Sequence, residues 1–153
     1  MAQEYVIRPI GVVRSAVRSL EDAPKQGTLA GTEAEIVVDP AYADALAGLA
    51  GRAGTADAPG TPGGGRRRSG KIIVLCWMDR ADRGRLKVHP RGQEDKPERG
   101  VFSTRSPHRP NPVSLHTVDL LEVRGNVLRV RGMDAVDGTP VLDIKPHSPE
   151  LDG

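Results

Sequence analysis

A proline-rich segment from Arg105 to Pro112 gathers side chains that could bind a charged ligand. Proline has a fixed φ and no N–H, so its three prolines hold the segment extended and out of regular strand pairing. Arg105 and Arg109 supply guanidiniums, and His108 and Asn111 supply further polar groups. A rigid row of donors suits a carboxylate, a phosphate or the polar edge of a base. The alternative is a surface turn rich in proline and arginine.

Two carboxylates stand three residues apart, at Asp134 and Asp137, just before Gly138. Carboxylates in nucleoside sites accept hydrogen bonds from ribose hydroxyls, and they also attract a nearby cation such as a sulfonium. The alternative is that both aspartates cap a turn, which aspartate often does. The residues alone leave both interpretations open.

The next run, Val141 to His147, alternates apolar and polar residues. This alternation predicts that Leu142 and Ile144 face one way, into the fold, while Asp143 and Lys145 share the opposite face. An exposed ion pair between them would contribute only about 0–1 kcal/mol and by itself indicates nothing about function.

Short runs rich in valine, isoleucine and leucine, separated by glycine and proline, predict a mainly β fold that must position these groups. The expected strands are Tyr5 to Arg14, Glu33 to Asp39, Lys71 to Asp79, Leu115 to Val123, Val127 to Met133 and Val141 to Ile144. Arg124, Gly125 and Asn126 suit a hairpin turn. Residues 85–89 are expected to pair with the strand before them.

One helix is predicted from Pro40 to Leu49, with Asp39 as its N-cap and Gly51 as its end. Residues 51–70 are poor in apolar side chains and rich in glycine, proline and alanine, which predicts a mobile loop. The arginines at 66–68 in this loop either contact RNA phosphates or form a solvated basic run.

Composition limits both fold and function. A chain of 153 residues supports one domain, residues 1–153, and an aromatic content of 3% requires an aliphatic core. The net charge of +2 is far below that of a protein that holds nucleic acid by charge alone. The single cysteine, Cys76, excludes an intrachain disulfide and is expected to be a buried thiol. No signal peptide or membrane span is predicted, so we expect a cytoplasmic protein.

Four segments together resemble the TsaA-like tRNA methyltransferase O family. Gly100 to Val113 and Asp134 to Pro146 match, almost residue for residue, the family patterns GVF-x-TRS-x-x-RPNP-[IV] and D-x-x-DGTP-[VI]-x-DIKP. Ile10 to Ser15 is similar to the family's IG-x-[VI]-RS strand, and Ala23 to Gly27 is similar to its PRQ loop, with lysine in place of arginine. The resemblance spans almost the whole chain.

The resemblance implies a small single-sheet antiparallel β-barrel that works as a homodimer and binds S-adenosylmethionine close to the subunit interface. It also implies a methyltransferase that acts on tRNA. Characterised relatives methylate threonylcarbamoyl-adenosine next to the anticodon, on the nitrogen that already carries the threonylcarbamoyl group.

The family pattern further implies which residues contact the ligands. The implied cofactor contacts are Pro24, Lys25, Gln26, Asp79, Arg80, Arg105, Leu115, Asp134, Ala135, Val136 and Asp137. The proposed substrate contacts are Arg109, Asn111 and Lys145. At the end of the buried strand, Asp79 and Arg80 replace a histidine and its neighbour in the family pattern, so this corner is expected to bear on the choice of acceptor.

Methyl transfer from a sulfonium is an in-line displacement, which needs positioning but no covalent nucleophile. A carbamoylated nitrogen is a poor nucleophile while it keeps its proton, so a base or a polarising contact is expected to assist. The candidates for this catalytic role are Asp79, His108 and His116, with His89 as a fourth.

Other functions remain open at this stage. One is a methyltransferase of the same fold with a different acceptor. Another is a non-catalytic RNA-binding module that uses Arg105, Arg109 and the basic run, and that binds RNA in a salt-sensitive way without affinity for the cofactor. A third alternative is a metal-assisted hydrolase. The sequence shows no recognisable spacing of metal ligands to support it, so no metal is expected.

Overall fold

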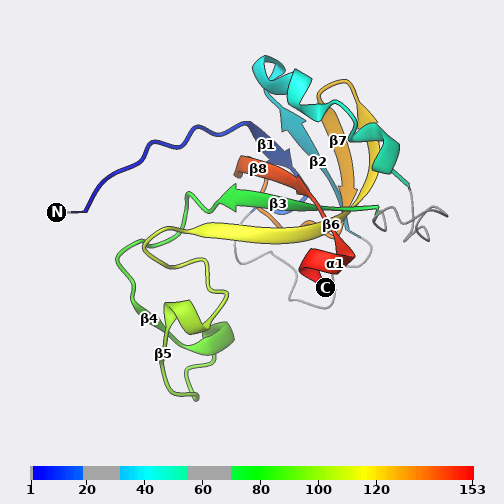
Figure 1. Cartoon of the computed structure of the whole chain (residues 1–153). Coiled ribbons are helices and arrows are strands. Elements are labelled where there is room, and N and C mark those ends of the chain that lie inside the picture. Colours follow the sequence, from blue (N-terminus) through cyan, green and yellow to red (C-terminus); the bar gives the residue numbers. More distant parts are fainter. Residues whose placement is uncertain (1, 19–31, 55–69) are drawn as a thin grey trace.

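Six strands of the described part of the chain close into one antiparallel barrel (Figure 1). The computed structural model describes residues 2–18, 32–54 and 70–153. The strands are β1 (Gly11–Arg14), β2 (Glu33–Val38), β3 (Lys71–Trp77), β6 (Val113–Arg124), β7 (Val127–Arg131) and β8 (Pro140–Pro146). Their order around the barrel is β1-β2-β7-β6-β3-β8, and β8 closes on β1. The predicted single-sheet β-barrel is therefore confirmed.

Strand β1 is much shorter than the predicted strand from Tyr5. Pro9 has no N–H for a sheet hydrogen bond, and the strand begins at Gly11, opposite Val38 of β2. A Cβ on Gly11 would lie 2.3 Å from the carbonyl oxygen of Val37, so only glycine lets the two backbones approach this closely. This glycine therefore determines how β1 and β2 meet.

Strands β6 and β7 form the predicted hairpin. Gly125, with a φ of 58°, and Asn126 make its two-residue turn. The Asn126 side-chain amide donates a 2.7 Å hydrogen bond to the Val38 carbonyl, which ties the turn to β2. Residues 113–118 of β6 extend past β7 and, among the described residues, pair only with β3.

A β-bulge in β8 changes which of its residues face the core. The pairing places Leu75 opposite Asp143 but Cys76 opposite Val141, so Leu142 is left without a partner position on β3. Val141 is fully buried, whereas Leu142 lies outside the core cluster. The prediction that Leu142 faces inward is wrong, because strict alternation does not hold across a bulge.

Aliphatic side chains fill the barrel, as the low aromatic content predicts. Ile36, Leu120, Leu128 and Met133 are among the largest fully buried side chains, and the core cluster of the described residues contains no aromatic ring. Cys76 is fully buried with them, which confirms the predicted buried thiol. Burial raises the pKa of this thiol to about 12, so it stays protonated at neutral pH.

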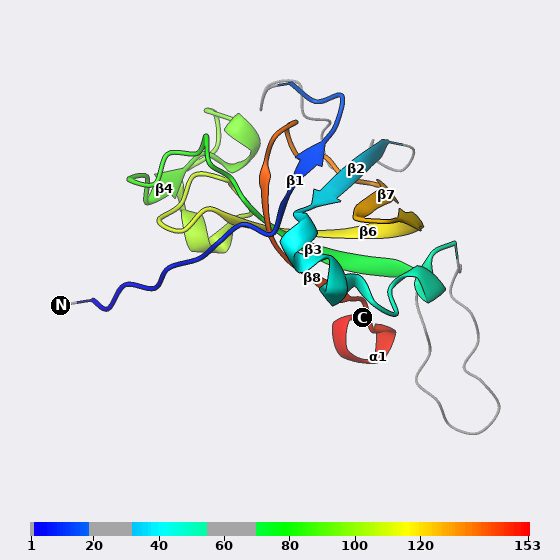
Figure 2. The ribbon, with the colours of Figure 1, turned by 90° about the horizontal axis from the view of Figure 1, so that it is seen from above.

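The predicted helix after Asp39 is present as a short 3₁₀ helix, η2 (Pro40–Leu46), which follows β2 (Figure 2). The Asp39 carboxylate accepts a 2.9 Å hydrogen bond from the Ala41 amide, so the predicted N-cap is confirmed. The helix ends before Leu49, because Gly48 has a φ of 87°, a left-handed conformation that a helix does not continue through. Two further short helices are η3 (Ala50–Arg52) and α1 (Pro149–Asp152).

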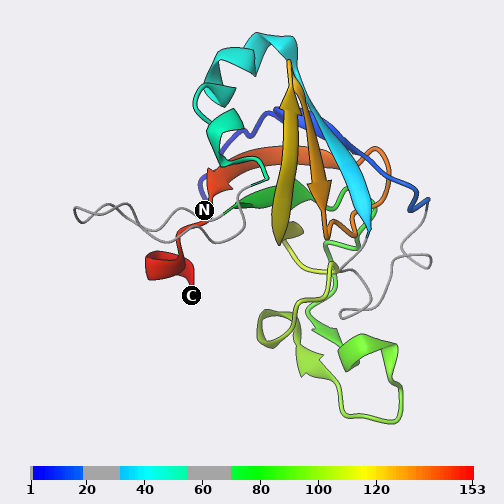
Figure 3. The same cartoon turned by 90° about the vertical axis from the view of Figure 1, so that its right-hand side faces the viewer.

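The segment between β3 and β6 lies beside the barrel as an irregular extension (Figures 1 and 3). It contains β4 (Lys87–Val88), β5 (Arg99–Gly100) and the 3₁₀ turns η4 (Pro90–Gly92) and η5 (Val101–Ser103). Strand β4 pairs with β5 and not with β3. The prediction that residues 85–89 pair with the preceding strand is wrong, because both edges of β3 are occupied by β6 and β8.

Residues 55–69 lie outside the described residues, and with them most of the predicted loop at 51–70 and its arginines at 66–68. Among the helices in the described ranges, none has the length and apolar character needed to cross a membrane.

Candidate functional site

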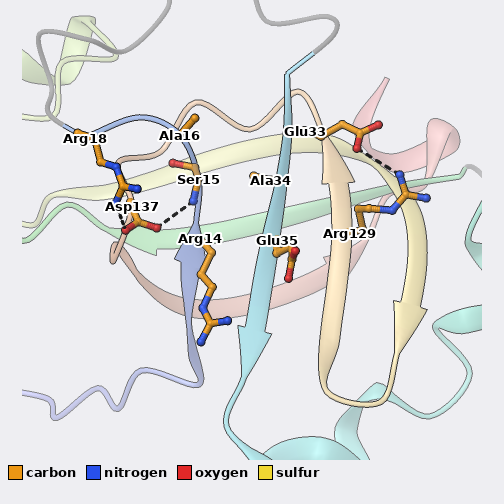
Figure 4. Close-up of a pocket in the computed structure, with 9 residues that line it drawn as sticks. All are labelled: Arg14, Ser15, Ala16, Arg18, Glu33, Ala34, Glu35, Arg129 and Asp137. Atoms are coloured by element: carbon orange, nitrogen blue, oxygen red, sulfur yellow. Dashed lines mark hydrogen bonds and ion pairs between the residues drawn. The ribbon is translucent and has the colours of Figure 1, made fainter.

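The turn that carries Asp137 is held against the end of β1 by hydrogen bonds (Figure 4). The Asp137 carboxylate accepts a 3.0 Å bond from the Ser15 amide and a 2.9 Å bond from the Arg18 guanidinium. The Ser15 hydroxyl donates a 2.7 Å bond to the Ala135 carbonyl, and the Asp137 amide donates to the Val17 carbonyl at 2.7 Å. The carboxylate therefore has a set orientation before any ligand arrives.

A shallow polar pocket of about 510 Å³ opens next to this carboxylate (Figure 4). It is lined by Arg14, Ser15, Ala16, Arg18, Glu33, Ala34, Glu35, Arg129 and Asp137. Within it, the Arg129 guanidinium pairs with Glu33 at 3.2 Å. Arg14 has no ion pair or hydrogen-bonded side-chain partner among the described residues, so its charge is available to a ligand in the pocket.

Arg80 reaches the same corner of the molecule as Asp137. Its guanidinium donates a 3.2 Å hydrogen bond to the Arg18 carbonyl, and Arg18 in turn pairs with Asp137. Residues 80 and 137, both expected to contact the cofactor, thus meet through Arg18. The neighbouring Asp79 is exposed, and its carboxylate makes no hydrogen bond or ion pair to the described residues.

Asp134 lies on the other side of the same turn, beside His116 of β6. The His116 Nδ1 atom is 3.0 Å from the Asp134 carboxylate, and its Nε2 atom is 2.8 Å from the Ser114 hydroxyl. The hydrogen bond from His116 holds the pKa of Asp134 below its ordinary value, so this carboxyl is ionised at neutral pH. The structure thus joins Ser114, His116 and Asp134 in one hydrogen-bonded chain.

The proline-rich segment is fastened to the end of β3 by Arg83. The Arg83 guanidinium donates to the Pro110 carbonyl at 2.7 Å and to the Asn111 side chain at 3.3 Å, and it lies 5.2 Å from the centre of the Trp77 ring. The His108 Nδ1 atom accepts a 3.0 Å bond from the Asp82 amide. The start of the segment between β3 and β6 is therefore tied to its proline-rich end, beside Trp77 of β3.

Arg109 and Arg105 differ sharply in their surroundings. The Arg109 guanidinium donates to three backbone carbonyls of its own segment, those of Ser106 (2.8 Å), Val101 (2.7 Å) and Thr104 (2.6 Å). Arg109 thus shapes the loop, and its predicted contact with substrate remains untested. Arg105 is exposed and has no hydrogen bond or ion pair among the described residues.

The remaining predicted contacts lie in different places. Leu115 is 51% exposed on the outer face of β6, opposite Leu75 of β3. Lys145 pairs with Asp143 at 2.9 Å and stands four residues beyond Val141, so it lies away from the Asp134 turn along β8. Pro24, Lys25 and Gln26 lie outside the described residues.

The sequence did not predict four residues that the structure places at the site: Ser15, Arg18, Arg83 and Ser114. Ser15 lies inside the matched IG-x-[VI]-RS segment, which was the one available signal. Arg18 and Arg83 act through partners far along the chain, and Ser114 acts through His116, whose own partner Asp134 comes from another segment, so no local pattern indicates them. In the described ranges, no group of three or more histidine, cysteine, aspartate or glutamate side chains is placed to hold a metal ion.

Comparison with known proteins identifies close relatives. Residues 65–153 match the model of the tRNA-methyltransferase O N-terminal domain. An S-adenosyl-L-methionine-binding protein of Archaeoglobus fulgidus is 44% identical over 147 residues, which cover 96% of this chain and 92% of that protein. A probable S-adenosyl-L-methionine-binding protein of Methanothermobacter thermautotrophicus is 47% identical over 149 residues, with 97% and 94% covered.

The fold also matches a solved structure. The crystal structure of TrmO from Pseudomonas aeruginosa is similar with a TM-score of 0.73 and 28% sequence identity. The similarity covers 100% of this chain and 59% of that one. The chain thus spans about three fifths of the length of that TrmO.

Proposed function

The chain belongs to the tRNA-methyltransferase O N-terminal domain family, and from this we propose that it is an enzyme that transfers a methyl group from S-adenosylmethionine to tRNA. The proposed acceptor is threonylcarbamoyl-adenosine next to the anticodon. The observation that carries the proposal is the meeting of Arg80, Arg18 and the Asp134–Asp137 turn at one corner of the barrel, because two segments expected to bind the cofactor, far apart in sequence, converge there. The relatives named for S-adenosyl-L-methionine binding support the cofactor.

The side chains expected to bind the cofactor fit S-adenosylmethionine by their chemistry. Asp134 and Asp137 are carboxylates, which suit ribose hydroxyls and a sulfonium charge. Arg105 is an exposed cation without a protein partner among the described residues, which suits the carboxylate of the cofactor. Leu115 adds an exposed apolar surface. When bound, the cofactor supplies an electrophilic methyl group on its sulfonium.

The protein's own task is to orient the partners and to exclude water from them. Asp137 is already aligned by Ser15 and Arg18, so little reorganisation is needed when a ligand hydroxyl binds. In the proposal, Asn111 and Arg109 hold the proline-rich segment in the shape that meets the substrate. Lys145, which lies further along β8, is proposed to contact the tRNA rather than the reacting base.

Hydrogen-bond partners favour one of the four candidate bases. The His89 Nδ1 atom lies 2.8 Å from the Lys96 carbonyl, in the segment between β3 and β6. His108 Nδ1 accepts from the Asp82 amide, so a neutral His108 carries its proton on Nε2 and acts there as a donor. His116 Nδ1 faces an ionised carboxylate, so a neutral His116 carries its proton on Nδ1 and keeps the Nε2 lone pair. Asp79 remains a candidate because its carboxylate is exposed and free among the described residues. We assign the proton-accepting role to His116.

Three broader features belong to the same proposal. The enzyme acts as one barrel domain, residues 1–153, it works as a homodimer with the cofactor near the interface, and it is located in the cytoplasm. The exposed Leu115 and the part of β6 that pairs only with β3 among the described residues support an interface on this side of the barrel.

Cofactor binding tests the proposal directly. Calorimetry with S-adenosylmethionine is expected to detect binding by the wild type and affinity at least tenfold weaker in Asp137→Ala and Arg105→Ala, since each change removes a charged contact worth about 1.5–3 kcal/mol. Glu150→Ala and Arg8→Ala, which remove exposed charges elsewhere, serve as matched controls. No binding by well-folded wild-type protein would contradict the proposal.

The acceptor needs a separate experiment. Mass spectrometry of tRNA nucleosides from cells with and without the gene is expected to show loss of methylated threonylcarbamoyl-adenosine. An unchanged nucleoside profile together with intact cofactor binding would instead favour the same chemistry on a different acceptor. Salt-sensitive RNA binding without cofactor affinity would favour a non-catalytic RNA-binding module.

A further inference from the structure

Ser114, His116 and Asp134 form a linear chain of hydrogen bonds. Ser114 and His116 stand two residues apart on β6, so both side chains point to the same side of the strand. Their partners across β3 are Cys76 and Val74, which belong to the core, so both side chains face the barrel interior near its end. Asp134 comes from the segment after β7 and completes the chain.

The positions of the hydrogens follow from the partners. Asp134 is ionised and can only accept, so the His116 Nδ1–H donates to it. The His116 Nε2 lone pair then accepts from the Ser114 hydroxyl, at 2.8 Å. The Cys76 thiol, which stands opposite Ser114 on β3 and stays protonated, completes the surroundings of the hydroxyl. Along this chain Ser114 donates to His116, and His116 donates to Asp134.

This arrangement prevents the imidazole from contacting a substrate directly. The His116 side chain is only 12% exposed, and both of its ring nitrogens are engaged by protein groups. Ser114 is only half-buried, although it shares the inward face of β6 with His116. Among Ser114, His116 and Asp134, the Ser114 hydroxyl is the group that can accept a proton from a ligand while it donates its own proton to His116.

We propose that Ser114 is a catalytic residue that takes the proton from the methyl acceptor and passes its own proton to His116, which Asp134 positions. The proposal rests on the proposed methyltransferase function and goes beyond it by naming the path of the proton. The acceptor nitrogen loses its proton to Ser114 Oγ, while the Ser114 proton moves to His116 Nε2. The nitrogen–methyl bond forms as the methyl–sulfur bond breaks, and the sulfur keeps the electron pair. The resulting imidazolium lies next to the Asp134 carboxylate, which stabilises it.

The hydroxyl, imidazole and carboxylate are arranged like the nucleophile, base and orienting carboxylate of a catalytic triad. In methyl transfer, however, the hydroxyl has no need to act as a nucleophile. Transfer from a sulfonium proceeds by displacement at carbon and needs no covalent enzyme intermediate. Proton removal is the step that the protein can assist, and a positioned base contributes roughly 10²–10⁴-fold to such a step.

Nitrogen-15 NMR of the histidine side chains tests the chain of hydrogen bonds without activity. We expect His116 in the wild type to carry its proton on Nδ1 at neutral pH. The Nε2 resonance is expected to shift in Ser114→Ala and to stay in place in Thr117→Ala, a matched change on the outer face of the same strand. A His116 that carries its proton on Nε2 would overturn the proposal.

Single-turnover methyl transfer to tRNA that carries threonylcarbamoyl-adenosine tests the role of the hydroxyl. Ser114→Ala is expected to slow transfer at least about a hundredfold with unchanged calorimetric affinity for S-adenosylmethionine, and Ser114→Thr to restore most of the rate. Wild-type rates in Ser114→Ala would overturn the relay and leave the proposed function intact. Wild-type protein that neither binds the cofactor nor methylates this tRNA would overturn the proposed function, and the catalytic role of Ser114 with it.

Discussion

Single residues at the candidate site are mostly bound by the protein before any ligand arrives. Asp137 accepts from Ser15 and Arg18, Arg109 donates to three carbonyls, and His116 is held at both ring nitrogens. Arg105 differs from these, since its side chain has no partner among the described residues. The bound side chains therefore shape the site, whereas Arg105 is available to bind a ligand.

Replacing Arg109 separates a structural role from a binding role. Arg109→Lys keeps the charge but loses the planar set of donors that reaches three carbonyls, so we expect the loop at 101–106 to loosen. Hydrogen exchange of these amides is expected to accelerate at least tenfold, while cofactor affinity changes less than threefold. Slow exchange combined with a large rise in the KM for tRNA would instead assign Arg109 to the substrate.

Asp134 is expected to make stability sensitive to acid. Its pKa lies below the ordinary 3.8, chiefly because of the hydrogen bond from His116. A carboxyl whose pKa is lowered on folding stabilises the protein above its unfolded pKa, and this contribution is lost as the pH falls through the folded value. The free energy of unfolding is therefore expected to decline below about pH 4, and to decline less in Asp134→Asn.

Urea unfolding at a series of pH values measures how steeply the free energy of unfolding declines as the pH falls. Glu122, whose pKa is also lowered by a hydrogen bond from Arg124, remains in the variant, so the slope is reduced rather than abolished. Identical slopes in wild type and Asp134→Asn would contradict the prediction.

At the scale of elements, close backbone contacts decide how the strands meet. The closest such contact is at Gly11, where β1 begins between β2 and β8. The bulge in β8 has a similar effect further along, because it lets Val141 rather than Leu142 enter the core. The strand that follows the Asp134–Asp137 turn is thereby aligned with β3, next to Cys76.

Gly11→Ala is expected to strain the contact between β1 and β2. The new Cβ would lie 2.3 Å from the Val37 carbonyl oxygen, and the backbone must move to relieve the clash. We expect a loss of about 1–3 kcal/mol in the free energy of unfolding, measured by urea denaturation. Gly100→Ala, where a Cβ meets nothing within 4 Å, is the matched control and is expected to change stability by less than about 0.5 kcal/mol.

At the scale of the whole molecule, a closed barrel leaves few places for a second subunit to pair. The outer face at the start of β6 is one of them, since Leu115 is 51% exposed there. The irregular extension and the proline-rich segment lie at the same end of β6 (Figure 1). An interface on this face would bring the second subunit close to the candidate site.

Light scattering tests the homodimer. The wild type is expected to have twice the mass of the 16.3 kDa chain. Leu115→Glu places a charge on the proposed interface and is expected to shift the protein toward the monomer, because burying an unpaired charge is costly. Leu151→Glu, at an even more exposed leucine on α1, is the control and is expected to stay dimeric. A monomeric wild type would contradict the dimer.

Local patterns were sufficient for much of the fold. The hairpin at Gly125 and Asn126, the N-cap at Asp39 and the buried Cys76 each depend on a few neighbouring residues, so the sequence predicts them correctly. The predicted strand from Tyr5 was too long, because Pro9 has no N–H for a sheet hydrogen bond. The predicted pairing of residues 85–89 was wrong, because both edges of β3 are occupied.

The sequence by itself determined the mainly β class, the aliphatic core and the motifs that mark the family, because these follow from residue types at short spacing. The barrel was implied by the family resemblance. Only the tertiary structure decided that Arg80 meets Arg18, that a bulge turns Leu142 out of the core, and that Ser114, His116 and Asp134 form one chain. Such contacts join residues that are distant along the chain. Their geometry depends on strand register and barrel closure, which no local pattern contains.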